Sequence, residues 1–103
     1  MDRILKLKAL LETSPADPFL KHALGLEYIK MGEENAARDQ FESLLEKDPT
    51  YVGTYYHLAK LLERTGDTSQ AIVTYEKGME EAKKAGETHA YNELKAAYEE
   101  LMF

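Results

Sequence analysis

The sequence predicts an all-α fold of antiparallel helix-turn-helix repeats with about six helices, and three observations support that prediction. Ala, Glu, Lys, Leu and Arg supply 53 of the 103 residues, whereas valine and isoleucine together supply only 5, too few for a sheet with several buried strands. Proline and glycine interrupt the helical pattern at a few defined places. The chain also matches itself when it is shifted by 34 residues.

The interruptions divide the chain into segments that are each long enough for a helix of about three to four turns. Prolines mark the loops after the first and third segments, and Gly32, Gly66 and Gly86 mark the ends of the second, fourth and fifth. Proline cannot continue a helix, and glycine is common just past a helix end. The connections between these segments are only a few residues long, and such short connections make neighbouring helices antiparallel. The expected helices are residues 2–13, 18–31, 34–47, 52–64, 68–84 and 88–102.

When the sequence is aligned with itself at this shift of 34 residues, large residues align with large ones and small residues with small ones. The aligned sets are Leu7 with Phe41 and Tyr75, Pro15 with Pro49, Gly32 with Gly66, and Ala37 with Ala71. Gly25 aligns with Ala59 in the middle of a helix, where glycine costs about 1 kcal/mol relative to alanine. We therefore expect another helix to pass close to Gly25.

The repeated residues resemble the tetratricopeptide repeat family, in which a bulky residue, Leu-Gly, Tyr, Ala, Phe and Pro follow at fixed spacings. The first copy has Lys21, Leu24, Gly25, Tyr28, Ala37, Phe41 and Pro49, and the second has Tyr55, Leu58, Ala59, Leu62, Ala71 and Tyr75. Lys83 occupies the proline slot of the second copy, so that unit is expected to run past its usual end. The resemblance implies a right-handed superhelix of helix pairs.

The repeat also predicts how one domain over residues 1–103 is organised. A half repeat at 2–15 precedes full repeats at 18–51 and 52–85, and a terminal half-repeat helix follows at 88–102. The last helix matches only at a shift of 36, so two residues are inserted around positions 84–86. Terminal repeats are commonly atypical because their outer faces meet water.

Charge and motif content argue against several functional classes. The net charge is −6 without a basic block, so we expect no nucleic-acid partner. There is no cysteine and no apolar run of the roughly 18 residues that a membrane span needs. The first residues do not resemble a signal peptide, so a cytoplasmic location is expected.

The sequence also lacks the motifs of phosphate-binding loops, zinc proteases and serine hydrolases. The histidines at 22, 57 and 89 occupy different repeat slots, so they should not converge on one metal ion. We therefore expect neither enzymatic activity nor a cofactor or metal.

The resemblance implies a non-catalytic scaffold that binds a peptide or protein partner in a concave groove lined by the first helix of each unit. When the groove positions of the family are transferred to the matching positions of this sequence, they predict a set of partner-binding residues. These are Phe19, His22, Leu26, Ile29, Tyr56, Lys60, Glu63, His89 and Asn92. A branch of the family grips a C-terminal carboxylate with Lys, Asn and Arg. The corresponding slots hold His22, Leu26, His57, His89 and Glu93, so this chain is not expected to act in that way.

A homodimer is the alternative function. The segment 18–31 is apolar on nearly every side, and such a helix should be buried. The N-terminal half unit covers part of it. The remaining apolar edge around Phe19 and Leu26 could pack against a second copy of the chain.

Overall fold

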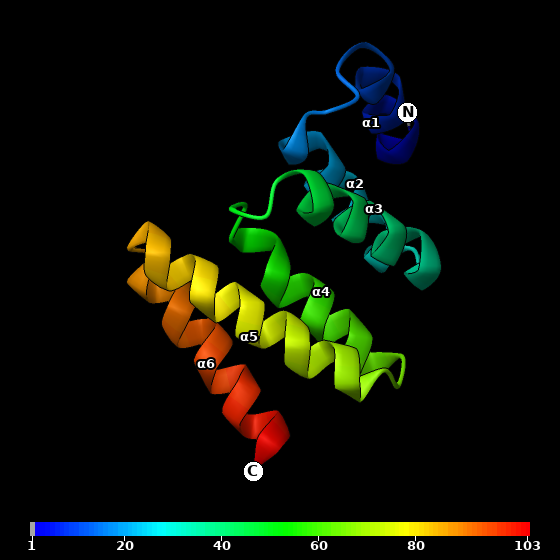
Figure 1. Cartoon of the computed structure of the whole chain (residues 1–103). Helices are drawn as coiled ribbons and strands as arrows, with labels where there is room; N and C mark the ends of the chain where they lie inside the picture. Colours follow the sequence, from blue (N-terminus) through cyan, green and yellow to red (C-terminus); the bar gives the residue numbers. More distant parts are fainter. Residues whose placement is uncertain (1) are drawn as a thin grey trace. The chain divides into compact units, whose positions relative to one another are not determined.

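The structure is a computed structural model that describes residues 2–103, and over this range it contains α-helices and no strand. The helices are α1 (Arg3–Thr13), α2 (Pro18–Lys30), α3 (Glu34–Lys47), α4 (Gly53–Arg64), α5 (Thr68–Ala85) and α6 (Thr88–Met102) (Figure 1). Each bound lies within one residue of the range that the sequence predicts. The all-α prediction is confirmed.

Aspartates and glycines set where several helices begin and end. Backbone N–H groups in the first turns of α1, α2 and α5 donate to the carboxylates of Asp2, Asp17 and Asp67, which satisfies donors that have no partner within the helix. Three glycines follow helix ends with positive φ angles of 77°, 89° and 71°, a conformation that costs glycine little. They are Gly32, Gly66 and Gly86.

The described residues form two compact units, one ending at Asp48 and the other spanning Pro49–Phe103. In the first unit, α2 packs against α1 and α3. In the second, α5 packs against α4 and α6, and α4 also contacts α6. The assignment of whole and half repeats within one domain stays a prediction.

The core of the first unit confirms the close approach expected at Gly25. Leu7, Leu24, Phe41 and Leu44 are almost completely buried. A Cβ atom placed on Gly25 would lie 2.7 Å from Cζ of Phe41, closer than carbon atoms pack. The ring of Phe41 therefore takes the volume that a side chain on α2 would need.

The second unit has a close approach of its own, at Gly78 of α5. A Cβ atom on Gly78 would lie 2.6 Å from Cβ of Tyr55. Gly78 occupies the repeat slot of the fully buried Leu44, and Tyr55 occupies the slot of Lys21. The second unit therefore pairs a tyrosine with a glycine at two slots where the first unit has a lysine and a leucine.

Helix α5 is also longer than its counterpart. It has 18 residues, whereas α3 has 14. Lys83 lies inside α5 at the slot where Pro49 follows the end of α3. The expectation that the second unit runs past its usual end is confirmed, because without proline the helix continues for about one more turn.

Candidate functional site

Three predicted partner-binding residues form a row along α4. Tyr56, Lys60 and Glu63 are all partly exposed, and their spacing of four and three residues places them on one face of the helix. The Lys60 ammonium lies 5.9 Å from the centroid of the Tyr56 ring and 3.8 Å from a carboxylate oxygen of Glu63. The row therefore offers an aromatic ring, a cation and a carboxylate side by side.

The structure gives Glu63 a second role that slot-by-slot reasoning missed. Tyr75 is fully buried on α5, and its hydroxyl donates a hydrogen bond to the Glu63 carboxylate. Burial, followed by this hydrogen bond and the charge of Glu63, raises the pKa of Tyr75 above its ordinary value. The buried Tyr75 hydroxyl thus fixes the position of the Glu63 carboxylate.

The internal repeat of the sequence contains an indication that Glu63 and Tyr75 form a pair. At the two slots of Glu63 and Tyr75, the first unit has Ile29 and Phe41. An apolar pair in one unit is replaced by a hydrogen-bonded pair in the other. A buried tyrosine needs an acceptor that a phenylalanine does not need, so comparing both slots together would have predicted the contact.

The other predicted residues of the second unit lie on α6. His89 and Asn92 are exposed, and α6 contacts α4 directly. Between these helices, His57 is half-buried; burial lowers its pKa, and the nearby charge of Glu93 on α6 opposes that shift.

The remaining four predicted residues lie along α2 in the first unit. Phe19 is 61% exposed, which is high for a phenylalanine. The imidazole of His22 lies 5.9 Å from the ring of Phe41, in a tilted arrangement. Leu26 and Ile29 are partly buried. This row is mostly apolar, in contrast to the mixed row on α4.

The structure thus brings the nine predicted residues together in two groups. Five belong to the second unit, on α4 and α6, and four belong to the first unit, on α2. A single groove lined by all nine stays a prediction.

Two further features concern the chemistry of the described residues. Within residues 2–103, no three His, Cys, Asp or Glu side chains lie close enough together to hold a metal ion. None of the helices that the structure describes is both long and apolar enough to cross a lipid bilayer.

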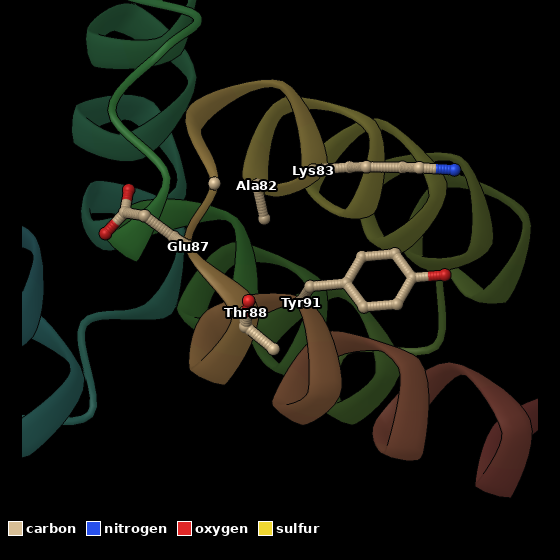
Figure 2. A pocket seen from close by; sticks show the side chains of 6 residues that line it. Ala82, Lys83, Glu87, Thr88 and Tyr91 are labelled. Atoms are coloured by element: carbon tan, nitrogen blue, oxygen red, sulfur yellow. The ribbon is translucent and has the colours of Figure 1, made fainter.

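A surface hollow of about 210 Å³ lies where α5 ends and α6 begins, and no sequence motif predicted it. Its lining residues are Ala82, Lys83, Gly86, Glu87, Thr88 and Tyr91. Figure 2 shows that the side chains of Lys83 and Tyr91 extend in the same direction, whereas the carboxylate of Glu87 points to the other side. The hollow is therefore bounded by an aromatic ring and a lysine.

Comparison with known proteins shows which family shares this helical architecture. Residues 28–98 match the family model of the tetratricopeptide repeat. The crystal structure of a tetratricopeptide repeat domain protein from Salinibacter ruber is 44% identical, covers 84% of this chain and 96% of its own, and superposes with a TM-score of 0.80.

Two relatives known from their sequences extend the comparison. A TPR repeat-containing protein of Pseudomonas aeruginosa is 26% identical over 88 residues, which are 85% of this chain and 84% of that protein. A tetratricopeptide repeat and J domain-containing co-chaperone of Cryptococcus neoformans is 43% identical over 44 residues. That match spans 43% of this chain and only 8% of the co-chaperone. The family-model match covers well over half of the residues, and the chain therefore belongs to the tetratricopeptide repeat family.

Proposed function

We propose that this chain is a non-catalytic module that binds a peptide or protein partner through the first-helix faces of its repeats. Tetratricopeptide repeat domains generally mediate protein–protein interactions. The observation that carries the proposal is the row of Tyr56, Lys60 and Glu63 on α4, whose side chains are partly exposed although all three contact one another or the core.

That row is suited to recognition because it is already ordered. The Glu63 carboxylate is fixed by the buried hydroxyl of Tyr75, and Lys60 is held between the ring of Tyr56 and that carboxylate. Ordering side chains on binding costs free energy, and a surface ordered in advance avoids much of that cost. A partner segment would meet an aromatic surface flanked by one positive and one negative group.

The proposal also includes His89 and Asn92 on α6 and, in the first unit, the apolar row of Phe19, His22, Leu26 and Ile29 on α2. A partner that contacts both rows would present an apolar stretch and a polar stretch.

A pull-down from cell extract with the wild-type chain and with a Tyr56→Ala plus Lys60→Glu variant tests the proposal. Proteins captured by the wild type should be lost with the variant. A control is Val73→Ala plus Lys84→Glu, which also removes exposed apolar surface and reverses one charge, at exposed positions of α5. If every captured protein survives the α4 change, the proposed surface is wrong.

The second candidate function is self-association through the N-terminal edge, and a specific observation favours it. Four large apolar side chains of the first unit are exposed by 50% to 67%, namely Leu5, Leu10, Phe19 and Met31. Exposed large apolar side chains can take part in an interface. Light scattering at micromolar concentration distinguishes the candidates: a dimer mass that becomes monomeric with Leu26→Asp supports self-association, and a monomer mass for both proteins refutes it.

A further inference from the structure

Tyr91, beside the hollow at the start of α6, has a counterpart whose surroundings differ. At a shift of 36 residues, Tyr91 occupies the slot of Tyr55. Tyr55 is 3% exposed, because Gly78 of α5 covers it and its hydroxyl donates to the Pro49 carbonyl at 2.6 Å. Tyr91 is only partly buried and lines the hollow. The same residue in the same slot is thus covered by a second helix in one case and open in the other.

Lys95 lies one turn after Tyr91 and marks the same difference. Its slot is occupied by Gly25 in α2 and by Ala59 in α4, both of which are buried, whereas Lys95 is exposed. In the other two repeats this slot is covered by the second helix of the unit. An ammonium group therefore stands on α6 where a helix would otherwise pack against a small residue.

The two complete repeats show which positions of a covering helix would meet these two residues. Phe41 fills the space at Gly25, and Gly78, in the slot of Leu44, lies against Tyr55. The slots of Phe41 and Leu44 are three residues apart, so they lie on one face of a helix. A helix packed on α6 in the same manner would place its first such residue against Lys95 and its second against Tyr91.

We propose that the α6 surface formed by Tyr91, Lys95 and the adjoining hollow docks a helix of a partner protein. That helix carries Asp or Glu against Lys95 and, three residues later, Gly against Tyr91. The acidic residue follows from charge complementarity with Lys95. The small residue follows from Gly78, since Tyr55 in the equivalent slot leaves no room for a Cβ atom. This surface uses none of the residues proposed for the first-helix groove.

The chain's own α1 does not fit this surface, so α1 of a second copy is not the occupant. At the two slots α1 has Leu7 and Leu10. Leu7 is 5% exposed and packs within its own unit, and it has no charge to pair with Lys95. Leu10 is too large for a position that requires glycine.

The test uses two 20-residue peptides that copy residues 67–86, which contain α5 with both of its caps. One carries Tyr75→Glu and the other Tyr75→Lys, so each presents a charge three residues before Gly78. Binding to the full chain is measured by fluorescence polarisation. We expect the Glu peptide to bind about three- to fivefold more tightly, the effect of an exposed ion pair.

Three variants of the full chain make the test specific. Lys95→Glu should reverse the preference between the peptides, and Tyr91→Ala should weaken both. Lys84→Glu, an equal charge change on an exposed position of α5 outside the hollow, should leave the preference unchanged. Circular dichroism verifies that each variant is folded.

The proposal is overturned if the peptides bind the wild type equally, if neither binds up to about 1 mM, or if Lys95→Glu leaves the preference intact. It is also overturned if Tyr56→Ala plus Lys60→Glu abolishes peptide binding while Tyr91→Ala does not, because the peptide then occupies the groove. That last result would support the proposed groove function, so the two proposals can fail separately.

Discussion

Replacing Tyr75 with phenylalanine tests whether the core and the α4 surface are coupled as described. The Tyr75 hydroxyl is fully buried and donates to the Glu63 carboxylate. A hydrogen bond to a charged group contributes about 1.5–3 kcal/mol. Glu63 keeps about a quarter of its side chain exposed and retains Lys60 as a neighbour. Its carboxylate therefore still has solvent and an ammonium group as partners in the variant. We therefore expect Tyr75→Phe to lower the free energy of unfolding by about 1.5 kcal/mol.

The reciprocal change removes the acceptor. Glu63→Ile leaves the buried Tyr75 hydroxyl without the partner seen in the structure, which costs about 2 kcal/mol. The double variant, Glu63→Ile with Tyr75→Phe, reproduces the apolar pair of Ile29 and Phe41 in the first unit. Since that pair needs no hydrogen bond, the double variant should lose less than about 1 kcal/mol.

The assay is urea unfolding followed by far-UV circular dichroism and by tyrosine fluorescence, whose coincidence checks for a single transition. Tyr98→Phe is the matched control, because its hydroxyl donates to Glu76 at an exposed position, over 3.2 Å. That variant should stay within about 0.5 kcal/mol of the wild type. Additive losses in the Glu63 and Tyr75 variants would refute the reasoning, since the two residues would then act independently.

Other changes follow from the same structure. Gly78→Ala should destabilise the chain by about 1–3 kcal/mol, because its Cβ would lie 2.6 Å from Cβ of Tyr55; Gly53→Ala, with no atom within 4 Å of its Cβ, should stabilise it by up to about 1 kcal/mol. Thermal unfolding compares the two, and equal effects would contradict the packing. Because the folded-state pKa of His57 is lowered, its contribution is present above its unfolded pKa of about 6.5 and is lost as the pH falls through the folded pKa. His57→Gln should flatten the loss of stability below about pH 6.5, measured as the urea midpoint against pH. Burial and the charges of two α5 glutamates raise the pKa of Tyr55 to about 12, so stability should fall as the pH rises from about 10 towards that value, and a flat urea midpoint over this window would contradict it.

The helices could be predicted from the sequence because their limits are set by local chemistry. Pro15, Pro18 and Pro49 cannot continue a helix, and glycine alone takes a positive φ angle at little cost. Gly25 was equally informative, since a glycine that weakens a helix needs a packing reason. Such residues act on their own backbone or on one close neighbour, so each can be read without knowing the rest of the fold.

The candidate site was harder to predict because its members act in pairs. Glu63 was assigned to the partner-binding surface from its slot alone, and its hydrogen bond with Tyr75 depends on two slots changing together. Gly78 was missed for the same reason, because its size has meaning only beside Tyr55. The hollow was missed because it depends on the orientation of Lys83 and Tyr91, which neither residue's identity reveals.

The close contact of Tyr55 with Gly78 has a consequence for folding. A chain of similar helices risks pairing the wrong ones, a common failure of repeat proteins. If a helix like α3, with leucine at this slot, took the place of α5 against α4, that leucine would enter the volume that the Tyr55 ring occupies. If a helix like α2 took the place of α4, the tyrosine ring that packs on Gly78 would be missing. Each wrong pair loses packing that the correct pair keeps. The contact of Tyr55 with Gly78 therefore makes α4 and α5 selective for each other, although the repeats share one pattern.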